Sequence, residues 1–168
     1  MSTLLVLGGA RSGKSSHAQA RAEAIGGELV FVATAEASDD EMADRIARHR
    51  ADRGARWSTI EAPVELAATI RRESRRGRVL LVDCLTLWAS NLLLAGRDIP
   101  AATDDLAEAI AAVQGPLILV SNEVGLGIVP DNALARRFRD AAGRVNQRVA
   151  ACADEVVFVA AGLPLKLK

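Results

Sequence analysis

A glycine-rich turn near the start of the chain has the residue types and spacing of a phosphate-binding loop. Residues 8–15 read Gly-Gly-Ala-Arg-Ser-Gly-Lys-Ser, which matches G-x-x-x-x-G-K-[ST] in full. Glycines let such a backbone curl so that its N–H groups point at phosphate oxygens, and the N-terminus of a following helix favours the same anion. Lys14 would reach the β- and γ-phosphates, and the Ser15 hydroxyl would bind Mg²⁺. Nucleotide contacts are therefore expected from Gly8, Gly9, Ala10, Arg11, Ser12, Gly13, Lys14 and Ser15.

Two further observations bear on this loop. Lys14 is the one internal lysine of a chain with 18 arginines and three lysines. Asp83 follows the apolar run 78–82, the usual place for the acid that holds Mg²⁺ through water. The alternative is that Asp83 only caps the next helix. The chain has no Asn-Lys-x-Asp sequence, which excludes an ordinary GTPase guanine site.

A second segment, residues 44–53, places one of the two histidines among arginines. If this segment is helical, Arg45 and Arg53 lie beside His49 at i−4 and i+4. Nearby guanidinium groups favour a neutral, nucleophilic imidazole and could hold phosphates in place for attack on phosphorus. A solvated Arg-rich helix with an incidental histidine explains the same pattern. His17 has no comparable neighbours and is interpreted as structural, and two histidines without paired cysteines show no metal-ligand spacing.

The loop at residues 121–130 follows an apolar strand and contains two glycines. Ligands of open α/β sheets bind beyond the carboxyl ends of the strands, so we expect Asn122 and Glu123 to face the nucleotide or its acceptor. A structural turn capped by Asn122 is the alternative. The basic side of the following helix, residues 136–148, fits an anion-binding wall, a subunit interface or a solvated surface equally well.

Composition limits the class of protein. The chain has 168 residues, of which 50% are hydrophobic, and its 21 basic and 21 acidic residues give a net charge of zero. This balance, with 3% aromatic residues, argues against nucleic-acid binding. Cys84 and Cys152 make no disulfide framework. The sequence shows no signal peptide and no apolar run near the ~20 residues that a membrane span needs. We expect one cytoplasmic domain over residues 1–168.

Strand and helix patterns alternate along the chain, and the strands are continuous apolar runs. Such runs suggest strands covered on both faces, and therefore a mostly parallel, three-layer α/β sheet. The expected strands are 3–7, 28–33, 57–61, 78–82, 116–120, 156–160 and 163–167. The expected helices are 14–25, 38–53 with Ser38 as its cap, 63–76, 85–94, 100–113 and 131–151.

Taken together, these motifs resemble one family. In order, the chain has GGARSGKS, an Arg-His-Arg helix followed by Trp57 and Glu61, VDCLTLW, NEVGLGIVP and RxFRDxxGRVNQ. The set is similar to the bifunctional adenosylcobinamide kinase/adenosylcobinamide-phosphate guanylyltransferases of cobalamin biosynthesis. The resemblance runs from Leu4 to Lys168, and the loop NEVGLGIVP and the GRVNQ helix are its most specific parts.

The resemblance implies a P-loop NTPase (RecA-like) fold, a homotrimer and two reactions. The first phosphorylates the aminopropanol hydroxyl of adenosylcobinamide with ATP or GTP. The second transfers GMP from GTP to adenosylcobinamide phosphate through a guanylyl-histidine, a role that falls on His49. Some members carry paired histidines there, whereas this chain has Arg48, which puts the position of the guanine in doubt. Beyond the loop, implied nucleotide contacts are Ala33, Thr34, Ala35, Arg50, Ala51, Asp52, Arg53, Glu61 and Asp83.

Two other functions remain open from the residues themselves. A small-molecule kinase would use the phosphate loop without a covalent intermediate. A nucleotide-dependent regulatory module would hydrolyse nucleotide slowly and respond through the loop 121–130. The arginine-flanked His49 argues against both.

Overall fold

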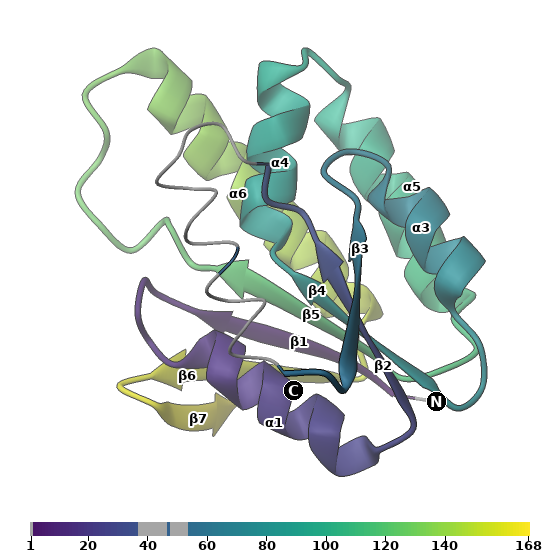
Figure 1. The fold of residues 1–168 in the computed structure, drawn as a ribbon. Helices are drawn as coiled ribbons and strands as arrows, with labels where there is room; N and C mark the ends of the chain where they lie inside the picture. Colours follow the sequence, from purple (N-terminus) through teal and green to yellow (C-terminus); the bar gives the residue numbers. More distant parts are fainter. Residues whose placement is uncertain (1, 37–46, 48–53) are drawn as a thin grey trace.

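The computed structural model describes residues 2–36, 47 and 54–168, and in them seven strands form one sheet. The strand order is β3-β2-β4-β5-β1-β6-β7 (Figure 1). The strands are β1 (Thr3–Gly8), β2 (Glu28–Ala33), β3 (Trp57–Glu61), β4 (Arg78–Asp83), β5 (Leu117–Asn122), β6 (Glu155–Ala160) and β7 (Leu163–Lys166). All neighbouring pairs are parallel except β6 and β7. The expected α/β fold with a mostly parallel sheet is confirmed.

Helices cover both faces of the sheet (Figure 1). The described helices are α1 (Lys14–Ile25), α3 (Leu66–Glu73), α4 (Leu85–Leu94), α5 (Ile99–Ala111) and α6 (Ala133–Cys152). Alternate residues of each strand point to opposite faces. Leu5 and Leu7 of β1 therefore pack in the core under α3–α6, whereas Leu4 and Val6 pack in the core under α1. This double burial is the reason that the strands read as continuous apolar runs.

Four elements have the bounds that the sequence predicts: α1, β2, β3 and α4. The expected helix at residues 38–53, with its cap Ser38, lies outside the described residues except for Ala47. None of the described helices is both long and apolar enough to span a bilayer.

The helix expected at residues 63–76 is shorter in the structure, which is a correction. The first backbone carbonyls of that stretch accept hydrogen bonds from side chains of α4, and the helix begins after them. Asn91 Nδ2 donates to the oxygen of Pro63 at 3.0 Å, and Trp88 Nε1 donates to the oxygen of Val64 at 2.8 Å. At the other end the extended backbone of Ser74 terminates α3.

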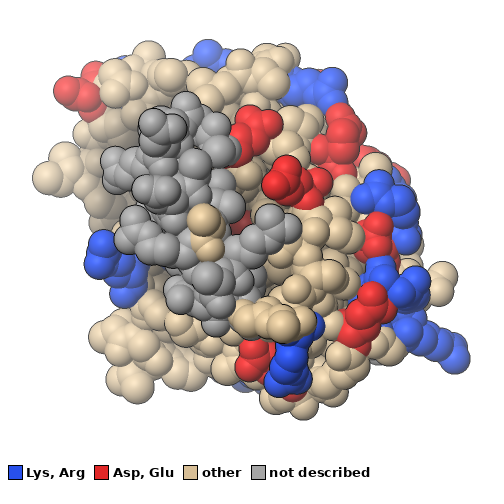
Figure 2. Space-filling model, viewed as in Figure 1, with Lys and Arg blue, Asp and Glu red and all other residues tan. Residues whose placement is uncertain are grey.

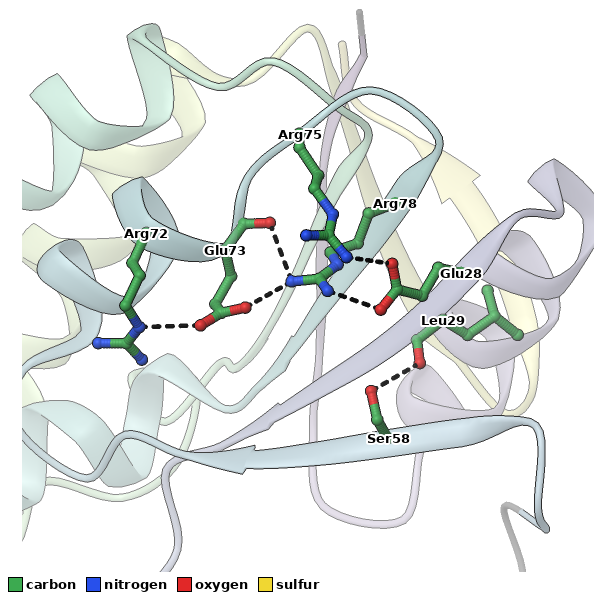
Figure 3. Close-up of polar contacts among 7 residues, drawn as sticks. All are labelled: Glu28, Leu29, Ser58, Arg72, Glu73, Arg75 and Arg78. Atoms are coloured by element: carbon green, nitrogen blue, oxygen red, sulfur yellow. Dashed lines mark hydrogen bonds and ion pairs between the residues drawn. The ribbon is translucent and has the colours of Figure 1, made fainter.

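An ion-pair network joins the amino ends of β2 and β4 (Figure 3). Arg78, 9% exposed, donates to Glu28 at 2.6 Å and to Glu73 at 2.5 Å, and Arg75 donates to Glu28 at 2.7 Å. Hydrogen bonds from these two arginines, that from Arg78 being the stronger, lower the pKa of Glu28 to about 2. On the face shown in Figure 2, acidic and basic side chains alternate over α3 and α5, where Arg71 pairs with Asp105.

Candidate functional site

The predicted site residues that the structure describes come together at one edge of the sheet. Parallel strands place their carboxyl ends at the same edge. In the pairing register, Gly8 of β1 lies opposite Asn122 of β5, and Ala33 of β2 lies between Asp83 of β4 and Glu61 of β3. The phosphate loop, Asp83 and Glu61 therefore share an edge, although 22 to 75 residues separate them along the chain.

The phosphate loop is a closed turn between β1 and α1. The backbone N–H of Ser12 donates to the oxygen of Gly9 at 3.3 Å, and Lys14 Nζ donates to the same oxygen at 3.0 Å. Lys14 therefore lies folded across the loop, with only 9% of its surface exposed. Ser15 is exposed at the first turn of α1. A cation and a hydroxyl thus stand where the sequence predicts phosphate and Mg²⁺ contacts.

Two glycines of the loop are required by space and by backbone conformation. A Cβ atom on Gly8 would lie 2.5 Å from Ser12 Oγ and 2.6 Å from the backbone oxygen of Val159. Gly13 has φ +93° and would meet Gly162 at 3.1 Å. Arg11 also has positive φ, 54°, although it is not a glycine. Such backbone strain is typical of ligand-binding turns.

The hairpin between β6 and β7, which is distant along the chain, contacts the phosphate loop. The backbone N–H of Gly162 donates to the oxygen of Ser12 at 2.7 Å. The sequence predicts no role for Gly162, because 149 residues separate it from Gly13. The sequence feature that could have drawn attention to Gly162 is its place in a Gly-x-Pro turn.

His17 lies in α1 near the loop and is not without charged neighbours. Burial lowers its pKa most, the Arg21 charge lowers it further, and Glu155 opposes both. The imidazole therefore favours the neutral form. Arg21 and Glu155 form a two-bond ion pair at 3.0 and 2.8 Å. The interpretation of His17 as structural agrees with this setting, in which α1 is tied to β6.

Thr34 is fully buried, which alters its expected role. Its hydroxyl donates to the oxygen of Cys84 at 2.7 Å and accepts from the N–H of Cys84 at 2.8 Å. Its own carbonyl accepts from Asn91 Nδ2 at 2.8 Å. These bonds use the only proton of the buried hydroxyl, so the side chain has no donor left for a phosphate. Thr34 instead holds the end of β2 against the end of β4, where Asp83 stands.

Asp83 is partly exposed at the end of β4, and it does not cap α4. The cap is Cys84, whose Sγ accepts from the N–H of Leu87 at 3.5 Å. Burial, and secondarily the charge of Asp83, raises the pKa of the Cys84 thiol. The thiol is therefore a neutral structural group.

The loop after β5 begins later than the sequence predicts, because Ser121 and Asn122 belong to the strand. The turn that follows is closed by Glu123, whose Oε1 accepts from the N–H of Gly125 at 2.8 Å. It is not closed by the Asn122 side chain. Asn122 Oδ1 is buried without a hydrogen-bond partner in the described part of the chain.

Three polar residues behind Asn122 are not predicted as site residues by the sequence: Thr86, Ser121 and Asn146. All three are at most 6% exposed and bond to one another or to Asn122. The signal for Asn146 was its spacing. It lies on the buried stripe of α6 with Ala142, Val145 and Val149, where an apolar residue is the norm.

Some arginines on the basic side of α6 bond to other residues, and others line a groove. Arg136 donates to the oxygen of Pro130 at 2.8 Å, and Arg148 to Asp104 at 2.9 Å. Arg137 and Arg144 line a groove of about 790 Å³ between α6 and the α4–α5 turn. No residue of the phosphate loop lines this groove.

His49 and its neighbours Arg50, Ala51, Asp52 and Arg53 lie outside the described residues. Their expected roles are therefore taken up below as proposals.

A phosphate loop between β1 and α1, at the carboxyl edge of a mostly parallel sheet, defines a P-loop nucleotide-binding α/β protein. Solved structures share this fold. An ATPase from the type III secretion system of pathogenic bacteria has a TM-score of 0.58 at 12% identity, over 98% of this chain and 57% of the ATPase chain. A protein of Pyrococcus horikoshii has a TM-score of 0.57 at 8% identity, over 99% and 86%.

The chain belongs to the cobinamide kinase/cobinamide phosphate guanyltransferase family, whose model matches residues 4–167. It is 51% identical to the bifunctional adenosylcobalamin biosynthesis protein CobP of Pseudomonas aeruginosa, over 98% of this chain and 96% of the relative. It is also 44% identical to CobU of Salmonella typhimurium, over 98% and 99%. The expected family is confirmed, and the protein is an enzyme of cobalamin biosynthesis.

Proposed function

We propose that this protein phosphorylates adenosylcobinamide and then guanylylates the product, with both transfers beginning from nucleotide at the phosphate loop. The observation that supports this most is the complete loop at the edge that also carries Asp83, in a chain of the cobinamide kinase/guanyltransferase family. Its nucleotide contacts are proposed at Gly8–Ser15, Ala33, Ala35, Arg50, Ala51, Asp52, Arg53, Glu61 and Asp83, with Thr34 contributing by position.

In the first transfer, the aminopropanol hydroxyl oxygen of adenosylcobinamide attacks the γ-phosphorus of ATP or GTP. The bond to the β–γ bridging oxygen breaks, the nucleoside diphosphate leaves, and the hydroxyl proton is released. Lys14 would stabilise the charge that develops on the β- and γ-phosphates. Its ammonium group donates to the oxygen of Gly9 at 3.0 Å and so lies at the loop where the phosphates are proposed to bind.

In the second transfer, a neutral ring nitrogen of His49 attacks the α-phosphorus of GTP and pyrophosphate leaves. A phosphate oxygen of adenosylcobinamide phosphate then attacks the GMP phosphorus. The P–N bond breaks, His49 is regenerated and adenosylcobinamide-GDP forms. Arginines around His49 would keep the imidazole neutral and hold phosphate groups for attack.

The donor groups at the loop fit Mg²⁺. Ser15 offers a hydroxyl, and Asp83 a carboxylate that would act through water, and both are the hard oxygen donors that Mg²⁺ takes. Among the described residues no cluster of three or more His, Cys, Asp or Glu could hold a metal ion, so most remaining ligands would be phosphate oxygens and water. When bound, the ion supplies charge neutralisation at the phosphates.

The same proposal includes a homotrimer in the cytoplasm. The loop after β5 and the start of α6 expose four large apolar side chains: Leu126, Ile128, Val129 and Leu134, at 51 to 98%. Exposed apolar side chains of this kind favour subunit contact. Sedimentation equilibrium tests the trimer: a species of three 17.7 kDa chains is expected, and a monomer would contradict it.

Labelling with GTP that carries a radioactive α-phosphate tests the two-step scheme. Wild type should retain label after denaturation, with the acid lability and base stability of a phosphoramidate. His49→Ala should retain none, and His17→Ala, which removes the other histidine, should label like wild type. No label in wild type, with γ-phosphate transfer intact, would reduce the function to that of a kinase. Loss of both transfers would favour a regulatory module.

A further inference from the structure

The end of β4 is held by Thr34, the residue that follows β2. The backbone N–H of Thr34 donates to the oxygen of Asp83 at 3.4 Å. Its hydroxyl, which is fully buried, donates to the oxygen of Cys84 at 2.7 Å and accepts from the N–H of Cys84 at 2.8 Å. The oxygen and the N–H of the peptide that joins Asp83 to Cys84 are therefore both bonded to this one residue.

Asn91 of α4 in turn fixes the position of Thr34. A carboxamide nitrogen carries two protons. Asn91 Nδ2 donates one to the oxygen of Thr34 at 2.8 Å and the other to the oxygen of Pro63 at 3.0 Å. Because Pro63 lies just after β3, one amide joins the ends of β2 and β3 to the helix that follows β4. A bonded polar network of this kind holds one arrangement of the three strand ends.

Asp83 lies on the face of the sheet that α1 covers. Successive residues of a strand point to opposite faces, so Asp83 shares the face of Leu81, which packs in the core under α1. Helix α1 packs against β1, β4 and β5, and Ser15 lies in its first turn. The two residues that are proposed to bind Mg²⁺ are therefore on the same side of the sheet, and the backbone of one of them is held by Thr34.

We propose that Thr34 and Asn91 are positioning residues for Mg²⁺, which hold the end of β4 so that the Asp83 carboxylate lies at the ion of the bound nucleotide. This inference rests on the proposed nucleotide site. It gives the two residues a role in magnesium affinity that differs from a general role in stability. A carboxylate placed at the ion adds affinity for nucleotide only when the ion is present, so Mg²⁺ separates the two roles.

Isothermal titration with the β,γ-imido analogue of ATP, once with Mg²⁺ and once with EDTA, measures this difference. Wild type should bind more tightly with Mg²⁺, and the ratio of the two affinities is the magnesium enhancement. Asp83→Asn should reduce the enhancement by about 10- to 100-fold, the range for one hydrogen bond to a charged group. An unchanged enhancement in Asp83→Asn would overturn the inference.

Thr34→Val and Thr34→Ser test the hydroxyl itself. Thr34→Val keeps the branched shape but loses the hydroxyl, and should reduce the enhancement by about 10-fold, the lower end of the range for residues that orient a metal ligand. Thr34→Ser keeps the hydroxyl and should retain most of the enhancement. An enhancement in Thr34→Val equal to that of wild type would overturn the positioning role.

Thr69→Val is the matched control for the loss of a buried hydroxyl. Thr69 is 4% exposed, and its hydroxyl donates to the oxygen of Glu65 at 2.9 Å, at the start of α3. This variant makes the same chemical change away from the end of β4 and should leave the magnesium enhancement unchanged. Equal losses in Thr69→Val and Thr34→Val would mean that lowered stability explains both, and would overturn the inference.

The double variant Thr34→Val/Asp83→Asn tests whether Thr34 acts through Asp83. If it does, the double variant should lose no more enhancement than Asp83→Asn alone, and additive losses would overturn this. Asn91→Ala removes the amide that bonds to Thr34 and should also reduce the enhancement. It provides the same test if Thr34→Val does not fold, and an unchanged enhancement in it would overturn the role of Asn91.

The proposed function can fail separately from this inference. A wild type that shows the enhancement but phosphorylates no adenosylcobinamide would contradict the proposed function, while the Thr34 variants would still test the positioning role. A wild type that binds the analogue equally with Mg²⁺ and with EDTA would overturn the inference, and one that binds no nucleotide would overturn both.

Discussion

Individual glycines of the phosphate loop differ in how much space they have for a side chain. Gly8 lies beneath Ser12 and against the backbone oxygen of Val159, so that a single added carbon has no room. Gly9, next in sequence, has open space where a Cβ would stand. Two neighbouring glycines of one motif therefore face different constraints, which the motif alone does not show.

Replacing these two glycines in turn tests the constraint. Gly8→Ala should lower the free energy of unfolding by about 1–3 kcal/mol, the usual range for overpacking, because the new Cβ would approach backbone oxygen at 2.6 Å. Gly9→Ala should change it by less than about 0.5 kcal/mol, as substitutions without a steric or polar consequence do. Urea unfolding of both variants measures this. Equal losses would show that the loop tolerates or rejects both side chains alike.

The sequence predicts the bounds of a helix or strand well where neighbouring residues determine them. The glycines after Ile25 and the apolar run of β2 give the bounds of α1 and β2 correctly. Residues bonded over long sequence distances are different. The hydrogen bonds among Thr86, Ser121, Asn122 and Asn146 join residues 24 to 36 positions apart, so no window of sequence shows that Ser121 continues the strand. For the same reason, the early carbonyls of the 63–76 stretch gave no sign that Trp88 and Asn91 would hold them.

The ion pairs at the amino ends of β2 and β4 should make stability depend on acid pH. The pKa of Glu28 is about 2 in the folded state, below its ordinary value of 4.5, so folding favours the charged carboxylate. Its contribution is complete above pH 4.5 and is lost as the pH falls from 4.5 toward 2. Glu28→Gln should remove that part of the pH dependence.

Thermal unfolding of wild type and Glu28→Gln between pH 7 and pH 2.5 measures this effect. Glu108→Gln is the matched control, since its carboxylate is 78% exposed and lies 3.8 Å from Arg71. The difference in melting temperature between wild type and Glu28→Gln should shrink as acid is added, and Glu108→Gln should follow wild type throughout. A constant difference would mean that the Glu28 charge contributes nothing.

For the molecule as a whole, the amino and carboxyl edges of the sheet carry different kinds of polar groups. The amino edge carries Arg78, whose two terminal nitrogens pair with Glu28 and Glu73. The carboxyl edge carries the phosphate loop, Asp83 and the unbonded Asn122 oxygen. The groups proposed to meet nucleotide therefore all lie at the carboxyl edge, so nucleotide should stabilise the entire fold through that edge.

Nucleotide at 100 times its dissociation constant should stabilise the protein by about 2.7 kcal/mol, because it binds only the folded chain. For a chain of 168 residues, this corresponds to a rise in melting temperature of about 5–10 °C. Lys14→Gln should abolish most of the rise, because the cation that meets the phosphates is lost. Lys166→Gln removes an exposed lysine of β7 and should keep the full rise. Scanning calorimetry with ATP and Mg²⁺ gives the comparison, and an equal rise in both variants would place the nucleotide away from the loop.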